Sequence, residues 1–507
     1  MVLFMQDSEK QRLTKLKIEH YRGFFDEQSF NFGIPAGKPG SGLTLVVGPN
    51  NAGKTSVLEA LLQMRQDNLQ KFRQPDRHEN NKPKINICFE NSSHGRYRVA
   101  ITNQGKGSYR DYTIYNDNGE IANIPAPNLE AVASRRHWSI VDDLSRYGTR
   151  DFPEYGNQVT NYMKLRQATG DSLTFRKLGS IRDDKDKKQR LDDMLKTLIP
   201  GFTDWDIDTG SDNQDYLEYV TSKGAHRADL LGDGTLSLFR ICLHLMDDKP
   251  DEVPVLIIDE PELSLHPVAQ SGLARLISES SANKQIIVCT HSPYFVNWND
   301  YKNGAKFVRL NKIDDGRCVI SELKKPAKYT PSLIKEEWMK PQLMDTVAKE
   351  IMFANSILFV EGQEDVGLIR KWLAKNRGGI TLNIFGYGAG GFQKIEKLLA
   401  MAKDLRIGRV AALYDGGASE SEAIAKARKK FLRKEGFRFF QLPTEDIRDK
   451  NRCSKCDKKC DCKCKRDGPR GCFDKLGNLK TEHEESFEEI MTRIIDYLVT
   501  PSVTSEG

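Results

Sequence analysis

The stretch LTLVVGPNNAGKTSVLEALL, residues 43–62, decides the first fold prediction. It begins with an apolar segment typical of a buried β-strand and ends with the apolar spacing of a helix. Between them, GPNNAGKT (48–55) matches G-x-x-x-x-G-K-[ST] in the strand–loop–helix context that this motif requires. Backbone N–H groups of such a loop surround phosphates at a helix N-terminus, where the helix dipole favours anions. The sequence therefore predicts a nucleoside triphosphate site, with ATP as the expected ligand.

Two residues of this loop have specific expected roles. Lys54 is expected to reach the outer phosphates, and the Thr55 hydroxyl is expected to ligate Mg²⁺. The other predicted nucleotide contacts come from the loop and the first helical turn: Gly48, Asn50, Asn51, Gly53 and Ser56.

Polar residues follow two further apolar segments. Asp259 and Glu260 end VPVLIIDEPE (253–262), and His291 follows the apolar part of KQIIVCTHSP (284–293). Alternation of buried strands with helices favours a parallel α/β sheet. We expect Asp259 to hold Mg²⁺ beside Thr55, Glu260 to orient and deprotonate the attacking water, and His291 to sense the outer phosphate.

These motifs resemble the ABC-type ATPases of the RecF and SMC kind. LTKLKIEHYRGF (13–24) is similar to the first strand of that family, and DEPELSLHP (259–267) to its acidic strand end. LGDGTLSL (231–238) lies where the family has its signature sequence, although its wording departs from LSGGQ. The resemblance implies that Gly232 and Gly234 present N–H groups to the nucleotide of a second copy. It therefore also implies a homodimer or higher homo-oligomer formed through paired ATPase domains.

Length and charge limit the class of protein. The chain has 507 residues, too many for one ordinary core, and its 77 basic and 71 acidic residues leave a net charge of +6. It is not a polycation, so nucleic-acid binding would need local basic patches. The sequence has neither an apolar run that spans a bilayer nor a signal-peptide pattern, and we expect a cytoplasmic protein without membrane contact.

A second α/β pattern begins after a proline-containing linker at 324–345. FVEGQED (359–365) is an apolar segment followed by Glu361 and Asp365, and ALYDGG (412–417) is another that ends in Asp415. Acids at adjacent strand ends of a parallel sheet can converge on divalent metals, which assist phosphodiester chemistry. The alternative is that these are solvent-facing acids at ordinary strand ends.

Glu361-Gly362 with Asp365, GYGAGG (386–391) and Asp415 resemble a TOPRIM domain. An ABC-type ATPase followed by TOPRIM resembles the OLD (overcoming lysogenization defect) endonucleases of bacterial anti-phage defence. The resemblance implies Mg²⁺ or Mn²⁺ at this site, DNA as substrate, and Glu445 as a further metal ligand. It also implies a possible defence-system partner protein or retron nucleoprotein.

One position departs from the TOPRIM pattern. The family carries Asp-x-Asp here, whereas this chain has Asp415-Gly416-Gly417. Three explanations remain open: the site is inactive, a nearby acid substitutes, or Gly417 is an introduced substitution. The candidate substitutes are Glu420, Glu422, Glu445 and Asp446. Lys475 or Lys480 is a candidate for stabilising the phosphate in the transition state.

Six cysteines crowd into a basic segment that has few aliphatic residues. They are Cys453, Cys456, Cys460, Cys462, Cys464 and Cys472. In a reducing compartment such spacing favours metal ligation over disulfides, and four thiolates suit Zn²⁺. We expect zinc bound by four of these residues, with Cys453, Cys456, Cys460, Cys464 and Cys472 as the candidates and an iron–sulfur cluster as the alternative. The basic side chains suit either a phosphate backbone or solvent.

These expectations combine into one architecture, which is α/β throughout. Residues 1–335 are predicted to form an ABC-type ATPase domain with a helical arm or dimerisation insertion at about 140–225. Residues 336–507 are predicted to form a smaller Rossmann-like TOPRIM domain with a Cys-rich zinc insertion at about 450–473. The leading function is an ATP-regulated, metal-dependent DNA endonuclease. The alternatives are a RecF-like DNA-binding ATPase without nuclease activity and an ATP-sensing scaffold of a defence complex.

Overall fold

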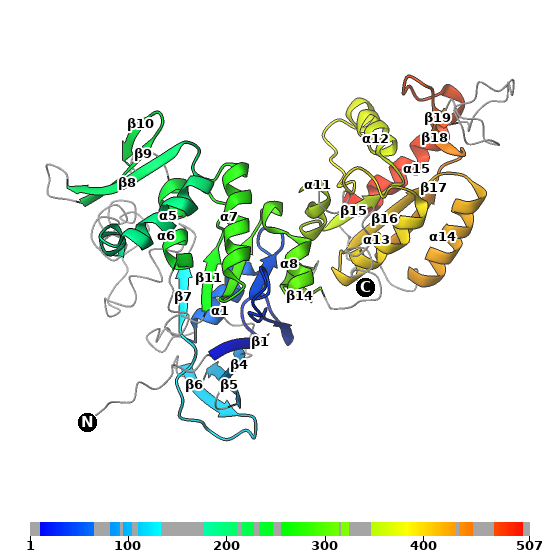
Figure 1. Cartoon of the computed structure of the whole chain (residues 1–507). Helices are drawn as coiled ribbons and strands as arrows, with labels where there is room; N and C mark the ends of the chain where they lie inside the picture. Colours follow the sequence, from blue (N-terminus) through cyan, green and yellow to red (C-terminus); the bar gives the residue numbers. More distant parts are fainter. Residues whose placement is uncertain are drawn as a thin grey trace, which may run out of the picture. The chain divides into compact units, whose positions relative to one another are not determined.

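The computed structural model divides the chain into two compact units, Met1–Glu322 and Leu323–Gly507 (Figure 1). The expected boundary at 335/336 lies outside the described residues. The structure describes residues 11–64, 82–91, 95–103, 110–132, 177–209, 215–227, 233–246, 255–313, 316–323, 346–431, 436–449 and 471–499.

The first unit contains a five-stranded antiparallel sheet with the order β2-β1-β4-β5-β6. Its strands are β1 (Gln11–Glu19), β2 (Gln28–Asn31), β4 (Lys84–Asn91), β5 (Gly95–Asn103) and β6 (Arg110–Asn116). Alternating burial along β4 shows that one face of this sheet packs into the core. β1 and β2 pair in antiparallel register on either side of the turn at Arg22-Gly23.

A six-stranded sheet with the order β14-β13-β3-β12-β11-β7 carries the phosphate loop. Its neighbouring strands pair in parallel except at β13–β14. The strands are β3 (Leu43–Val47), β7 (Leu129–Val132), β11 (Val255–Asp259), β12 (Gln285–Thr290), β13 (Lys306–Lys312) and β14 (Cys318–Glu322). The helical elements of this region are α1 (Lys54–Leu62), α6 (Asp233–Met246), α7 (Pro267–Ser280), the 3₁₀-helix η3 (Pro293–Phe295) and α8 (Trp298–Asn303).

A buried glutamine joins the two sheets. Gln285, at the start of β12, donates to Leu13 O and Gly33 O at 2.8 Å each and accepts from Leu13 N at 2.8 Å. Apolar residues of both sheets and of α1 form one core cluster. The antiparallel sheet therefore fixes the parallel strands that present the phosphate loop.

The predicted helical insertion at 140–225 is only partly helical where it is described. After α5 (Lys185–Leu198), the chain forms the antiparallel strands β8 (Phe202–Thr209), β9 (Asp215–Thr221) and β10 (Gly224–Arg227). The prediction was wrong for residues 202–209 and 215–225, where alternating FTDWDIDT and the turn at 222–223 favour strands over a helix.

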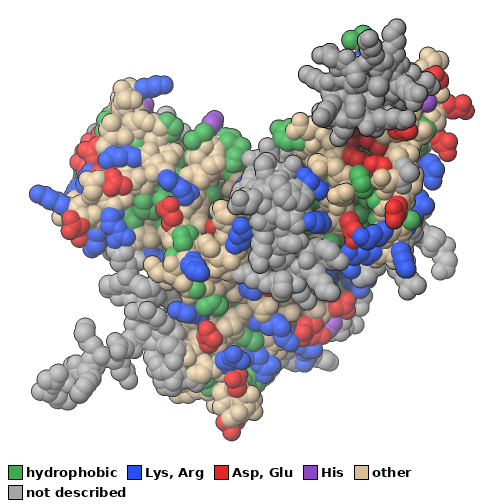
Figure 2. Space-filling view, turned by 45° about the vertical axis from the view of Figure 1, so that its right-hand side comes forward, with side chains coloured by type: hydrophobic (Ala, Val, Ile, Leu, Met, Phe, Trp, Pro, Cys, Tyr) green, Lys and Arg blue, Asp and Glu red, His purple; other side chains and the backbone are tan. Residues whose placement is uncertain are grey.

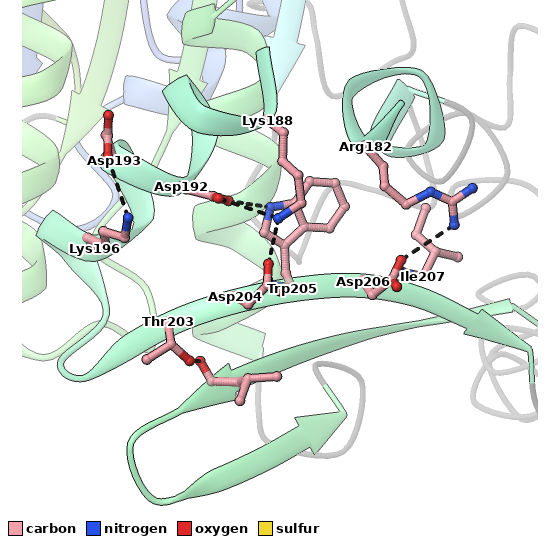
Figure 3. A network of polar contacts seen from close by, with 11 residues as sticks. Arg182, Lys188, Asp192, Asp193, Lys196, Thr203, Asp204, Trp205, Asp206 and Ile207 are labelled. Carbon is pink, nitrogen blue, oxygen red and sulfur yellow. Dashed lines mark hydrogen bonds and ion pairs between the residues drawn. The ribbon is translucent and has the colours of Figure 1, made fainter. Parts of the chain in front are cut away.

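Side chains join α5 to this sheet (Figure 3). The Trp205 indole donates to Asp192 Oδ1 at 2.8 Å, and Lys188 lies over the Trp205 ring at 5.5 Å from its centroid. Trp205 is 1% exposed. Because α5 also packs against α6 and α7, this part of the insertion is anchored to the ATPase core.

The second unit is a smaller α/β fold with three parallel strands in the order β15-β16-β17. The strands are β15 (Ser356–Phe359), β16 (Arg409–Tyr414), β17 (Phe437–Gln441) and the separate parallel pair β18 (Asp446–Arg448) and β19 (Gly471–Phe473). The helical elements are α11 (Thr346–Lys349), the 3₁₀-helix η5 (Glu350–Met352), α12 (Gln363–Asn376), α13 (Phe392–Asp404), α14 (Ala418–Phe431) and α15 (Thr481–Val499). A second core cluster joins these strands to α12 and α15.

The surface carries both signs of charge, as the small net charge predicts. Figure 2 shows Lys and Arg side chains interspersed with Asp and Glu on the face that it draws. Within the described ranges, no helix combines the length and the apolar character needed to cross a bilayer.

Candidate functional site

The phosphate loop connects β3 to α1 in a conformation that ordinary residues rarely adopt. Asn51 and Gly53 have φ angles of 63° and 98°, and Gly53 is the N-cap of α1. Lys54 Nζ donates to Gly48 O and Pro49 O at 2.9 Å each, so the ammonium group lies within the loop. The loop thus gathers a cation and the N-terminal N–H groups of α1 in one place, which suits a polyphosphate.

The electrostatics of Lys54 link the loop to the neighbouring strands. Burial lowers the pKa of Lys54, and nearby Cys289, Glu260 and Asp259 counteract this shift. Asp259 ends β11 and is 8% exposed. The predicted acids and the phosphate loop therefore lie at the same edge of the parallel sheet.

Glu260 and His291 face each other across β11 and β12. Glu260 N donates to Cys289 O at 2.8 Å, and Glu260 Oε1 lies 3.6 Å from His291 Nε2. Burial and the charge of Lys54 lower the pKa of His291, which favours a neutral imidazole near pH 7. A carboxylate and a neutral imidazole beside a phosphate loop can orient water and receive its proton.

Glu262 is a site residue that the sequence reasoning missed. Its carboxylate accepts from His291 N at 2.6 Å and from Thr290 Oγ1 at 2.7 Å. Burial raises its pKa, in part opposed by these hydrogen bonds. Glu262 therefore fixes the end of β12 that carries His291. The signal was present as the third acid of DEPE (259–262), two residues beyond Glu260.

The remaining predicted nucleotide contacts occupy different surroundings. Thr55 and Ser56 are half-buried in the first turn of α1, whereas Asn50 and Asn51 are exposed. Gly234 is buried in the first turn of α6, and a Cβ atom there would lie 2.4 Å from Ser264 O. Gly234 thus permits close packing between α6 and the loop after β11. Gly232 lies outside the described residues, and contact of either glycine with a second nucleotide stays a prediction.

The second unit gathers acids at the carboxyl ends of β15 and β16. Glu361 Oε1 accepts from Asp415 N at 2.9 Å, which joins the two strand ends. Gly390 N and Gly391 N donate to Glu361 O at 2.8 and 2.9 Å. The GYGAGG loop therefore encloses the backbone of Glu361 and fixes its position.

Gly388 allows that loop to approach closely. Its φ angle is +85°, and a Cβ atom there would lie 2.6 Å from the carbonyl carbon of Gly362. Both the backbone conformation and the space require glycine at this position.

The acidic cluster perturbs the ionisation of Glu361. Its pKa is raised to about 7, mainly by burial and also by the nearby charges of Asp365, Glu420 and Asp446. Asp446 is 6% exposed, whereas the side chain of Glu445 is exposed. The geometry therefore favours Asp446 over the predicted Glu445 as the acid from β18.

Gly417 leaves space that another acid fills. A Cβ atom at Gly417 would lie 2.1 Å from Glu420 Oε2. The carboxylate of Glu420, in the first turn of α14, therefore occupies the place where a side chain at position 417 would begin. Glu420 is thus the best placed of the candidate substitutes for the missing acid.

The acids do not converge as tightly as the sequence suggested. Asp365 Oδ2 accepts from Gly362 N at 2.9 Å and so caps the start of α12. Among the residues that the structure describes, no group of three His, Cys, Asp or Glu side chains is arranged to hold a metal ion. The expectation of three carboxylates on one ion is therefore not supported by this geometry.

Cys472 belongs to the core of the second unit. It lies in β19 with 0% exposure, and its Sγ is 3.1 Å from Thr444 Oγ1. Burial raises the pKa of its thiol. The other cysteines of the predicted zinc cluster, Cys453, Cys456, Cys460, Cys462 and Cys464, lie outside the described residues.

The two candidate lysines differ in their contacts. Lys480 Nζ pairs with Asp449 Oδ1 at 2.8 Å, beside the β18–β19 pair. Lys475 is exposed. The ion pair fixes Lys480 near the strand that brings Asp446 to the acidic cluster.

These features define an ATP-binding domain of the ABC-type ATPase class. A phosphate loop lies between a buried strand and a helix, and acids and a histidine follow the neighbouring strands. Residues 43–297 match the family described as AAA domain, putative AbiEii toxin, Type IV TA system. This match spans half of the chain, so the chain belongs to that family.

Comparison with curated proteins and solved structures adds relatives. The OLD nuclease of Thermus scotoductus is 25% identical over 393 residues, which are 70% of this chain and 72% of that protein. This relative confirms the predicted resemblance to the OLD family.

The SMC head domain of Thermotoga maritima is 16% identical, with a TM-score of 0.37, and the match covers 62% of this chain and 99% of that one. The Smc head domain of Pyrococcus furiosus, bound to the C-terminal domain of ScpA, is 15% identical, with a TM-score of 0.41, over 64% and 99%. These superpositions are loose, and the ATPase assignment rests on the phosphate loop, the sheet order and the family match.

Proposed function

We propose that this protein is an ATP-regulated, divalent-metal-dependent DNA endonuclease of the OLD type that acts in bacterial anti-phage defence. The observation that carries the proposal is Glu361, held between two strand ends with its pKa raised to about 7 among other acids. Perturbed carboxylates of this kind mark candidate functional sites. The similarity to an OLD nuclease supports the reaction class.

The donor chemistry of the acidic site fits a divalent cation. Neighbouring carboxylates that help to raise the pKa of Glu361 bring an excess of negative charge to this site, which a cation neutralises. Mg²⁺ retains several waters and binds through one or two carboxylates, so three converging acids are not required. Glu361 and Asp415 would hold the ion, and Asp446 or Glu420 would contact the waters that it retains. A bound Mg²⁺ or Mn²⁺ would activate the nucleophile and stabilise the leaving oxygen.

The residues of the chain perform the remaining tasks in this proposal. Glu361 holds the Asp415 backbone in place, so the two acids keep a fixed separation. Glu420 supplies the carboxylate that Gly417 lacks. Lys480, which pairs with Asp449, would stabilise the negative charge that develops on the phosphate.

ATP is proposed to control this chemistry through association of two copies. Lys54, Thr55 and Asp259 would bind ATP with Mg²⁺, and Glu260 with His291 would hydrolyse it. In the domain assignment that we propose, residues 1–335 form the ATPase domain and residues 336–507 form the TOPRIM domain. A zinc site within about 450–473 and a defence-system partner protein or retron nucleoprotein belong to the same proposal.

Plasmid cleavage tests the nuclease proposal. Supercoiled DNA is incubated with the chain and Mg²⁺ or Mn²⁺, with and without ATP. We expect metal-dependent cleavage that Glu361→Gln lowers by about 100-fold or more, since this change removes a charged ligand at the reacting centre. The matched control is Glu485→Gln, an exposed acid on α15. Wild-type cleavage by Glu361→Gln would contradict the proposed site.

A second candidate function is favoured by Gly417 and by the absence of a three-acid metal group among the described residues. In this alternative the protein is a RecF-like DNA-binding ATPase or an ATP-sensing scaffold, and its acidic site does not cleave DNA. ATP hydrolysis and DNA binding without cleavage, both by the wild-type chain and by Gly417→Asp, would favour it.

A further inference from the structure

A groove of about 630 Å³ lies at the outer side of β17, in the second unit. β17 is the last strand in the order β15-β16-β17, and it packs against both α14 and α15 (Figure 1). An edge strand presents backbone groups that no neighbouring strand pairs, and proteins commonly cover such an edge with charged side chains. This groove is distinct from the acidic site and from the ATP site.

Three arginines from three elements line the groove: Arg428 of α14, Arg438 of β17 and Arg493 of α15. All three side chains are exposed. The acid that lines the groove is Asp496, so the lining has an excess of two positive charges. Charge complementarity therefore favours an anionic occupant.

The arginines are oriented by contacts that use only part of their hydrogen-bonding capacity. Arg428 Nη2 donates to Phe439 O at 3.4 Å, and Arg438 Nη1 donates to Phe437 O at 3.2 Å. The Arg438 and Arg493 guanidinium groups lie over the rings of Tyr497 and Phe440, at 5.3 and 5.7 Å from the centroids. A guanidinium has five N–H donors, so each retains donors for phosphate oxygens.

The strand that lines the groove, β17, also contacts the backbone of the acidic site at its last residue. Gln441, the last residue of β17, donates through Nε2 to Asp415 O at 3.1 Å and to Gly417 O at 3.3 Å. Five residues of strand span about 16 Å. The arginines therefore lie within about 16 Å, measured along β17, of the strand end that contacts Asp415.

We propose that the arginine groove along β17 binds the phosphate backbone of the DNA strand that enters the acidic site. The occupant is DNA because the groove is basic, its arginines retain hydrogen-bond donors for phosphate oxygens, and the strand that lines it ends in a residue that contacts Asp415. This inference rests on the proposed function, since it assigns the substrate track of the same site.

Fluorescence anisotropy with a labelled DNA duplex in EDTA tests the groove apart from cleavage. The variant is Arg428→Gln with Arg438→Gln and Arg493→Gln. The matched control is Lys375→Gln with Lys403→Gln and Lys429→Gln, which removes three exposed charges that do not line the groove. Glutamine retains most of each aliphatic stem, so packing changes little.

We expect the arginine variant to bind at least about tenfold more weakly at 0.1 M salt, since charge-assisted hydrogen bonds are lost. Loss of three phosphate contacts lowers the slope of log affinity against log salt by about 2 to 3. The lysine variant keeps wild-type affinity within about twofold, because surface charge that does not line the track contributes little.

Three outcomes would overturn the inference. Equal affinity of the arginine variant and the wild-type chain, with cleavage intact, would refute the groove and leave the proposed function standing. Absence of DNA binding by the wild-type chain would refute both. A changed oligomeric state on gel filtration with unchanged DNA affinity would assign β17 to a protein interface. Thermal melting of each variant verifies that it is folded.

Discussion

The ATP site and the acidic site both lie at the carboxyl ends of parallel strands, but they are built in different ways. Most of the ATP site comes from one continuous loop, and Lys54 binds two carbonyls of that same loop. The acidic site is assembled from residues more than fifty positions apart, such as Glu361 and Asp415. From this difference we expect that a site built from one loop tolerates few substitutions. In a site assembled from distant residues, one acid can take the place of another.

The largest expected effect is at the local site. Lys54→Ala is expected to weaken ATP binding on the order of 100-fold, because it removes charge-assisted hydrogen bonds to the phosphates. Binding of a fluorescent ATP analogue measures it, with the exposed Lys38→Ala as control. If the two sites act independently, Mg²⁺ binding at the acidic site stays unchanged in this variant. Wild-type ATP affinity in Lys54→Ala would contradict the assignment of the ATP site to this loop.

The next largest effect is expected at the acidic site, where one acid can be exchanged for another. Glu420→Ala is expected to reduce metal-dependent cleavage by about 30-fold or more, since a carboxylate beside the ion is lost. Gly417→Asp combined with Glu420→Ala is expected to restore much of the activity, because truncation to alanine vacates the space that the new carboxylate enters.

Exposed Glu422→Ala is the control for that series. Plasmid cleavage by all four variants, including Gly417→Asp alone, gives the coupling between the two positions. Unchanged cleavage in Glu420→Ala would show that Glu420 does not replace the missing acid.

A smaller effect is expected from the residue that positions His291. Glu262→Gln replaces one accepting oxygen with a donor that faces His291 N or Thr290 Oγ1. The rate of ATP hydrolysis should fall roughly tenfold through misplacement of the histidine, while ATP affinity stays within about twofold. Glu279→Gln, an exposed acid of α7, is the control. A loss of ATP affinity as large as the loss of rate would show that Glu262 acts on binding instead.

The smallest effect concerns stability and pH. The pKa of Glu361 is raised to about 7, so the folded protein retains a proton that the unfolded chain releases at lower pH. The contribution of this proton to stability is complete below about pH 4.3 and is lost as the pH rises to 7. The loss amounts to as much as about 3 kcal/mol.

Thermal melting in EDTA measures this dependence. The melting temperature of the wild-type chain should fall between pH 5.5 and 8, and Glu361→Gln should melt higher than the wild-type chain at pH 8. Added Mg²⁺ should raise the wild-type melting temperature at pH 8 and leave the variant nearly unchanged. A parallel pH dependence in both chains would exclude Glu361 as the titrating group.

The sequence predicted the elements of each unit better than their side-chain partners. The apolar segments before Lys54, Asp259 and His291 all form strands of one sheet, because each is buried on both faces. The secondary structure of the insertion was predicted poorly. The charged segment before β8 has a helical pattern, and that pattern was extended over the alternating residues of β8 and β9. Glu262 was missed because its role depends on β12, which lies beside β11 only in the folded chain.

The sequence by itself determined the ATP site, the α/β class and the acids at two strand ends, because these depend on local motifs and on the burial of apolar segments. Only the tertiary structure decided that Asp446 rather than Glu445 faces Glu361, and that Glu420 fills the space at Gly417. It also placed Cys472 in the core and the three arginines along one strand edge. The physical reason is that distant side chains meet only where strands pair and helices pack, and one sequence does not specify those distances.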